Sequence, residues 1–350
     1  MSNPRNPLPL PPHFDPGKIG EVWRVPYEER ALQASQWRNE HNLAPASEDD
    51  HKIALFAVDV QNTFCLPEFE LYVAGRSGTG AIDDTRRLVE FIYRNLGVIS
   101  YVSATMDTHQ AMQIFHSIFL VNDRGEHPDP LTIVSADDIH TGRWKFNRAI
   151  AESLNIDPEY GQRHLEHYVD ELAKRKKYEL TIWPYHSMLG GIGHALVSAF
   201  EEALFFYTIA RYSQPEFIIK ARNPLTEHYS ALGPEILTGP DGRQIGEKND
   251  KILNKLQEVD AVIIAGQAKS HCVAWTVEDL LAGIWKIDEN LAEKVYLLED
   301  CSSPVVVPEV VDYTEQADAG YQRFSNAGMH IVRSTEPIES WPGIKMFEQA

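Results

Sequence analysis

Short runs of apolar residues recur along the chain, and most of them end at a polar or charged residue. Continuous apolar runs of this kind are typical of strands that are buried on both faces of a sheet. Six runs fit the description, and each predicts a strand: Ile53–Val58, Val98–Met106, Phe217–Ile219, Val262–Ala265, Lys294–Leu298 and His330–Val332.

Between these runs the apolar residues recur at intervals of three and four, which places them on one face of a helix. Val273, Val277 and Leu280 share such a face. Strands that alternate with helices indicate a parallel sheet. The sequence therefore predicts an α/β fold: a doubly wound, mostly parallel six-stranded sheet with helices on both faces. The predicted helices are Ala81–Asn95, Trp144–Leu154, His164–Lys177, Ala195–Arg211 and one that begins at Cys272.

Two regions lie outside this alternation. Residues 1–51 have a proline-rich start and little apolar pattern, so we expect an N-terminal arm that lies on the domain or on a partner subunit. We expect residues 52–350 to form the α/β domain. Within it, residues 128–181 are expected to be a largely helical insertion, over the mouth of the site or at a subunit interface. Asp241-Gly242 predicts a hairpin-like turn.

Composition limits the partners. The net charge of −19 argues against nucleic acid and against an anionic membrane surface. No apolar run is long enough to cross a bilayer, and the N-terminal residues lack the pattern of a secretory signal. Three cysteines far apart in the chain do not make a disulfide framework. We therefore expect a reduced, cytoplasmic protein that acts on a small molecule, and we expect it to be a homo-oligomer.

Reactive residues stand where four of the predicted strands end. Asp59, Asp107 and Lys220 each follow a strand directly, and Cys272 follows the turn Gly266–His271. In open α/β sheets, ligands bind outside the carboxyl ends of the strands. Any one of these residues alone could be a solvated loop residue. Four of them together indicate a single crevice.

Cys272 is the strongest candidate for a nucleophile, because it stands where a buried strand turns into a helix. Free backbone N–H groups and the helix dipole lower the pKa of a thiol at that position and can also hold an oxyanion. Lys220 would stabilise the thiolate, and Asp59 could take the thiol proton and pass it to a leaving group. This set suits attack on a carbonyl with expulsion of an amine. A lone cysteine can also be only a small buried apolar side chain.

Asp107-Thr-His109 predicts two metal ligands on one side of an extended segment, because side-chain direction alternates along a strand. A third ligand must come from elsewhere, and His116 and His127 follow in loop-like sequence. One carboxylate and two imidazoles would leave open positions on the metal for water or substrate.

Five segments, in this order, resemble the nicotinamidase branch of the isochorismatase-like cysteine hydrolases. The resemblance covers about residues 52–335, and its specificity lies in the whole set rather than in any one motif. The segments are Ala57-Val-Asp59-Val-Gln61-Asn-Thr-Phe64-Cys65, Thr105-Met-Asp107-Thr-His109, Trp183-Pro-Tyr-His186, Lys220 with Tyr229-Ser230, and Gly266-Gln-Ala-Lys-Ser-His-Cys272-Val.

The resemblance implies a site and a reaction. It implies a catalytic triad, an oxyanion hole formed by backbone N–H groups after a cis peptide bond before Ala268, and a divalent metal, usually zinc or iron. It also implies hydrolysis of a small amide, nicotinamide first of all, through a thioester on the cysteine, and so a role in NAD metabolism. The implied residues are Asp59, Lys220 and Cys272 for the triad, Ala268 and Cys272 for the oxyanion hole, Asp107, His109 and His186 for the metal, and Phe64 and Trp183 beside the nicotinamide ring.

Some positions depart from the family pattern. Gln110 stands where proline is usual, Ala221 where glycine is usual, and Lys269-Ser270 where Thr-Asp is usual. These departures bear on the substrate more than on the reaction type. Three alternatives therefore stay open: a hydrolase of another small amide, an isochorismate hydrolase, and a catalytically silent binding homologue. The intact triad argues against the last.

Overall fold

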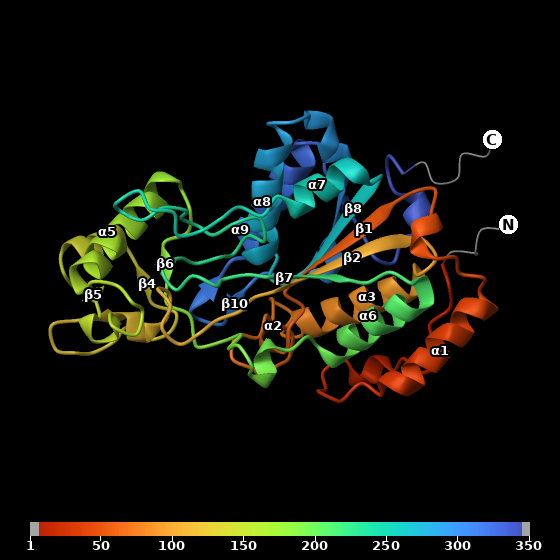
Figure 1. Cartoon of the computed structure of the whole chain (residues 1–350), viewed down its shortest axis with the longest axis horizontal. Helices are drawn as coiled ribbons and strands as arrows, with labels where there is room; N and C mark the ends of the chain where they lie inside the picture. Colours follow the sequence, from red (N-terminus) through yellow and green to blue (C-terminus); the bar gives the residue numbers. More distant parts are fainter. Residues whose placement is uncertain (1–6, 345–350) are drawn as a thin grey trace.

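The computed structural model describes residues 7–344, so the start of the predicted arm lies outside the described residues. A six-stranded sheet forms the centre of the molecule, in the order β12-β9-β8-β1-β2-β7 (Figure 1). Every strand pair in this sheet is parallel. The strands lie at the six predicted positions, with ends shifted by at most one residue: β1 (Ile53–Val58), β2 (Ile99–Met106), β7 (Glu216–Ile219), β8 (Ala261–Gly266), β9 (Val295–Leu298) and β12 (His330–Val332).

Alternate residues of β1 enter two different apolar cores. Leu55 and Ala57 belong to the core on one face of the sheet, and Phe56 and Val58 to the core on the other. Because both faces are covered, the strand reads as a continuous apolar run. The predicted doubly wound fold is confirmed. Helices α3 (Gly80–Arg94) and α6 (Ser198–Arg211) cover the first face, and α7 (Lys251–Glu258), α8 (Cys272–Ile284) and α9 (Thr314–Asn326) cover the second (Figure 1).

The N-terminal region adds one helix to the outside of the domain. Helix α1 (Tyr27–Glu40) packs against α6. A half-buried ion pair joins them, with Nε of Arg30 2.6 Å from Oε1 of Glu202. Ala34 and Trp37 of α1 are buried in the core beneath. No helix among residues 7–344 is long and apolar enough to cross a membrane.

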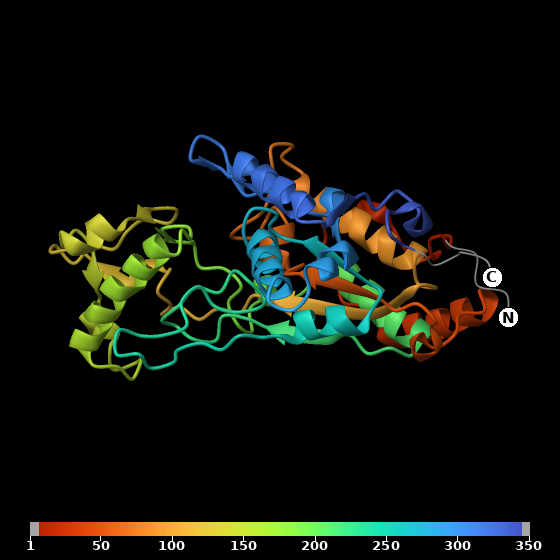
Figure 2. The same cartoon turned by 90° about the horizontal axis from the view of Figure 1, so that it is seen from above.

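At the opposite end of the molecule from α1, residues 112–183 and 223–245 form a lobe with its own apolar core (Figure 2). Phe119, Phe146 and Leu165 are fully or almost fully buried in that core. The secondary structure of the lobe is β3 (Leu120–Val121), β4 (Ile133–Val134), α4 (Ala136–His140), β5 (Lys145–Phe146), α5 (Pro158–Lys174) and β6 (Leu180–Thr181).

The predicted helix Trp144–Leu154 is wrong. Lys145 and Phe146 form β5, which pairs antiparallel with β3. The Asn147 side chain then accepts a hydrogen bond from the amide of Ala149 and starts a short 3-10 helix, Arg148–Ile150. Phe146 and Ile150 are buried in the core of the lobe, which they reach from a strand and a short 3-10 helix.

Smaller elements complete the chain. Cys65 is the last residue of the short helix α2 (Asn62–Cys65). The predicted turn at Asp241-Gly242 is confirmed, since Thr238 and Gln244 bridge antiparallel around it. A small hairpin of β10 (Val306–Val307) and β11 (Val311–Asp312) precedes α9.

The lobe gives the protein a pH-dependent stability. Nε2 of His164, in α5, donates a hydrogen bond to the carbonyl of Leu225 at 2.7 Å, and burial lowers the pKa of His164 to about 4. The neutral imidazole therefore stabilises the fold fully above its unfolded pKa of about 6.5, and this contribution is lost as the pH falls from 6.5 to 4. The loss amounts to up to about 3 kcal/mol.

His164→Gln keeps a donor for Leu225 but does not titrate. In urea unfolding at pH 7 and at pH 4, we expect the wild type to lose up to about 3 kcal/mol more than this variant. His140→Gln, at an exposed position of the lobe, serves as the control and should behave as the wild type. Equal pH dependence in all three proteins would contradict this role of His164.

Candidate active site and metal centre

The carboxyl ends of four neighbouring strands bring the reactive residues together. Asp59 follows β1, Asp107 follows β2, Lys220 follows β7, and Cys272 begins α8 directly after the turn that ends β8. Nζ of Lys220 lies 2.6 Å from Oδ2 of Asp59 and 3.7 Å from Oδ1 of Asp107. The side chains of Lys220 and Asp59 are fully buried. The structure thus joins the acid and the amine into one ion pair beneath the cysteine.

The backbone between β8 and α8 needs glycine at its first position. Gly266 has a φ of +114°, and a Cβ built on it would lie 2.1 Å from the carbonyl oxygen of Val58. The peptide bond between Gln267 and Ala268 is cis, as the resemblance implies. Among residues 7–344, neither the amide of Ala268 nor that of Cys272 has a hydrogen-bond acceptor. Two free N–H groups therefore flank the thiol at the start of α8.

The expected low pKa of the Cys272 thiol is wrong for the protein without ligands. Cys272 is only 6% exposed, and burial raises the pKa of its thiol well above the ordinary value. Lys220 acts in the opposite direction, but the nearby carboxylates of Asp59 and Asp107 raise the pKa further. Burial and two negative charges outweigh the lysine and the helix dipole. Cys272 therefore rests as a neutral thiol.

The ion pair beside the thiol is strongly coupled. Burial alone would lower the pKa of Lys220, but the carboxylates of Asp59 and Asp107 hold it well above the ordinary value. Burial raises the pKa of Asp59, which Lys220 partly offsets. Thr105 holds Asp59 in place, since its hydroxyl donates to Oδ1 at 2.5 Å. A carboxylate with a raised pKa is suited to accept a proton and to release it again.

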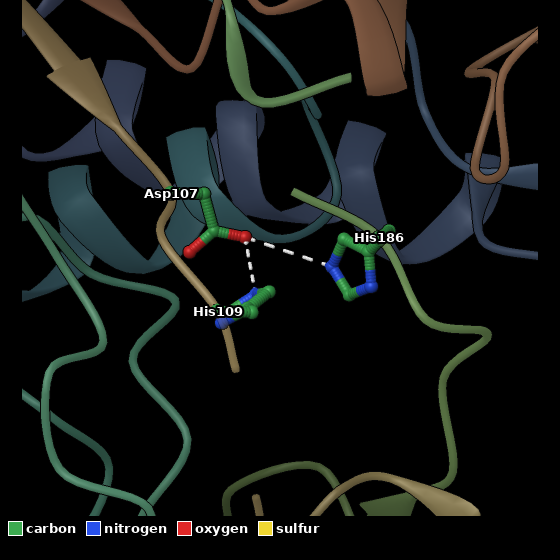
Figure 3. Close-up of side chains that lie close together, drawn as sticks. All are labelled: Asp107, His109 and His186. Carbon is green, nitrogen blue, oxygen red and sulfur yellow. Dashed lines mark ion pairs between the residues drawn. The ribbon is translucent and has the colours of Figure 1, made fainter. Parts of the chain in front are cut away.

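Asp107, His109 and His186 form a buried cluster whose possible ligand atoms all lie within 4.8 Å of one another. Oδ2 of Asp107 lies 2.7 Å from Nε2 of His109 and 3.6 Å from Nε2 of His186 (Figure 3). Nδ1 of His186 donates to the carbonyl of Pro184 at 2.7 Å, which leaves its Nε2 lone pair free for a metal. One carboxylate and two imidazoles fit zinc or iron.

Ionisation in this cluster also suits a cation. Burial lowers the pKa of His109, which favours the neutral imidazole that a metal requires. Burial alone would raise the pKa of Asp107, but His109 and Lys220 outweigh it and hold that pKa well below the ordinary value. Oδ1 of Asp107 is buried and has no hydrogen-bond donor among the described residues. These three side chains would hold the metal.

The two rival ligands lie elsewhere. Nδ1 of His127 bonds to the carbonyl of Leu120, in the lobe. His116 borders the cluster, with its ring centre 5.9 Å from that of His109 and 6.1 Å from that of His186. Its Nδ1 donates to backbone carbonyls. The structure therefore brings His186, rather than His116 or His127, to Asp107 and His109.

A small cavity lies between the thiol and the metal cluster. Trp183 and Phe64, the two predicted ring-binding residues, both line it, and Nε1 of Trp183 donates to the Tyr229 hydroxyl at 2.9 Å. The complete lining is Phe64, Leu71, Val73, Asp107, Trp183, His186, Glu227, Tyr229, Ala268, His271, Cys272 and Val305.

Distant similarity to this chain occurs among solved structures. No family model and no curated protein matches the chain. Among solved structures, a nicotinamidase/pyrazinamidase from Acinetobacter baumanii is 18% identical, with 82% of this chain and 98% of that chain covered and a TM-score of 0.48. The yeast nicotinamidase Pnc1p is 15% identical, with 80% and 99% covered and a TM-score of 0.48. A pyrazinamidase of Pyrococcus horikoshii, solved in complex with zinc, is 18% identical, with 80% and 98% covered and a TM-score of 0.40.

Structural similarities this distant say nothing about chemistry, so the function rests on the motifs and on the geometry of this chain.

Sequence reasoning missed several residues of the cavity. Glu227 and His271 line it, and burial raises the pKa of Glu227 well above its ordinary value. The only available signal for His271 was its place beside Cys272. Glu227 follows no strand and had no signal at all.

Proposed function

We propose that the chain is a metal-containing cysteine amidohydrolase that converts nicotinamide to nicotinic acid and ammonia. One arrangement carries this assignment: a buried thiol and two of the three metal-ligand side chains, Asp107 and His186, line a single cavity, and a buried acid–ammonium pair interacts with that thiol. A binding protein has no need of a thiol, a proton acceptor and a buried lysine in contact.

In the proposed reaction, Cys272 attacks the carboxamide carbon while Asp59 takes the proton from its thiol. The Lys220 ammonium stabilises the sulfur as this proton leaves. The oxyanion that forms accepts hydrogen bonds from the amides of Ala268 and Cys272. Asp59 then donates the proton to the departing nitrogen, so ammonia leaves and a thioester remains on Cys272.

The second half regenerates the enzyme. Asp59 takes a proton from water, the hydroxide attacks the thioester carbon, and the Cys272 sulfur leaves and recovers a proton. A divalent ion, zinc or iron, held by Asp107, His109 and His186 would supply a Lewis-acid contact for the pyridine nitrogen. Phe64 and Trp183 would hold the flat ring between them, and such positioning supplies a large part of the rate enhancement.

Ammonia release from a panel of amides tests this function. With added zinc or iron, the wild-type protein should release one ammonia per nicotinamide consumed, and removal of the metal with a chelator should lower the rate. Release from another small amide alone, or cleavage of isochorismate by metal-free protein, would replace nicotinamide with that alternative substrate. Binding of nicotinamide without any turnover would identify a silent homologue.

A further inference from the structure

The turn between β8 and α8 carries a hydrogen-bond donor that the proposed mechanism does not use. His271 immediately precedes the nucleophile, lines the cavity and is 4% exposed. Ser270, at a position where the family usually has aspartate, is fully buried beside it. Oγ of Ser270 lies 2.9 Å from Nδ1 of His271.

The partners of Ser270 decide which ring nitrogen of His271 carries the proton. Oγ of Ser270 accepts a hydrogen bond from the amide of Val305 at 3.0 Å. Among residues 7–344, Nδ1 of His271 is the only acceptor within reach of the Ser270 hydroxyl proton. If Nδ1 carried the proton instead, that buried hydroxyl proton would have no partner, which is costly, whereas Nε2 of His271 is not one of the fully buried atoms that lack a partner. Nδ1 therefore accepts, and the proton of the neutral ring is on Nε2.

The surroundings of His271 leave that Nε2–H for a ligand. Four aromatic rings enclose the imidazole, with ring centres 4.7 to 5.4 Å away: Tyr178, Trp183, Tyr229 and Tyr313. None of the described residues accepts a hydrogen bond from Nε2. Burial lowers the pKa of His271 to about 3, so the ring stays neutral and keeps a single donor.

We propose that Ser270 fixes His271 as a neutral Nε2–H donor to the substrate, so that the site selects flat ring amides with a hydrogen-bond acceptor beyond the nitrogen that meets the metal. This inference rests on the proposed function and deepens it, because it names the substrate class. An aspartate at position 270 could only accept, and it would place the proton on Nδ1 and turn Nε2 into an acceptor. The Ser270–His271 pair thus distinguishes this chain's cavity from one with aspartate at position 270.

Four amides of nearly equal shape test the selection. Nicotinamide has one ring nitrogen, meta to the carboxamide. Pyrazine-2-carboxamide, pyrimidine-5-carboxamide and pyridazine-4-carboxamide keep that nitrogen and add a second at the ortho, the other meta or the para position. For the wild type, kcat/KM for the diazine whose added nitrogen meets Nε2 should exceed that for nicotinamide by about three- to tenfold, the effect of one hydrogen bond.

Matched variants assign the selection to the pair. His271→Phe keeps a ring but removes the donor, so the ratio of kcat/KM for the preferred diazine to kcat/KM for nicotinamide should fall to about one, whatever the absolute rates. His271→Gln keeps an N–H at a similar reach and should retain part of the preference. Ser270→Ala removes the hydroxyl that holds the His271 proton on Nε2, so it should weaken the preference for the diazine.

Three outcomes overturn the inference. The ratio of kcat/KM for the diazine to kcat/KM for nicotinamide could be the same in the wild type and in His271→Phe. That result would show that the donor does not meet the substrate. An equal loss of kcat/KM on all four amides in the His271 variants would place the role of His271 in the fold or at the reacting carbonyl. An unchanged ratio in Ser270→Ala would remove Ser270 from the pair. Failure of the wild type to hydrolyse any of the four would instead contradict the proposed function.

Discussion

Replacing Cys272 with alanine should lower ammonia release from nicotinamide by at least about 10³-fold, because Cys272 is the only thiol among the described residues that line the cavity. The protein should stay folded, since the change removes only one sulfur atom at the edge of a cavity. The measurement is ammonia release by metal-loaded protein, beside a circular dichroism spectrum and metal content.

Cys301→Ala is the matched control. Cys301 is buried and free, like Cys272, but it lies after β9, away from the cavity. This variant should keep nearly all activity. If Cys272→Ala retained the wild-type rate, the covalent mechanism would be excluded.

Replacing His186 with alanine should remove both the metal and the activity. The variant leaves only Asp107 and His109 as ligands, and loss of one of three ligands lowers metal affinity by much more than the loss of an outer partner, which alone costs about 10- to 100-fold. Metal analysis of the wild type should find about one divalent ion per chain, and of His186→Ala almost none.

His127→Ala is the control for this change, because His127 is exposed in the lobe. It should keep both the ion and the rate. His116→Ala decides the remaining alternative: as a neighbour of the cluster rather than one of its three ligands, His116 should be dispensable for the ion. A metal-free His116→Ala together with a metal-loaded His186→Ala would reverse the assignment of the third ligand.

Much of the fold was predictable because strands that are buried on both faces appear in the sequence as short apolar runs. All six runs became strands, and the polar residues that end them met at one edge of the sheet. The predicted first residue of a helix was less accurate where the sequence analysis overlooked an N-terminal capping residue. Helix α5 begins at Pro158 rather than at His164, because the Asp157 side chain accepts a hydrogen bond from the amide of Tyr160 and proline suits the first turn.

Other features depended on contacts distant in sequence. The predicted helix at Trp144 failed because β3, more than twenty residues earlier, pairs with Lys145 and Phe146. The pKa of Cys272 depends on how deeply the turn is buried, and sequence alone gives no measure of depth. Ala221 was noted as a departure from glycine, and its φ of 57° shows why glycine is usual there.

The most direct test of the covalent mechanism is partitioning with hydroxylamine. Nicotinamide and methyl nicotinate have different leaving groups but would give the same thioester on Cys272, which hydroxylamine and water then attack in competition. The ratio of hydroxamate to nicotinic acid should therefore be identical for the two substrates at each hydroxylamine concentration. A ratio that depends on the leaving group, or ammonia release without any hydroxamate at high hydroxylamine, would contradict a Cys272 acyl-enzyme.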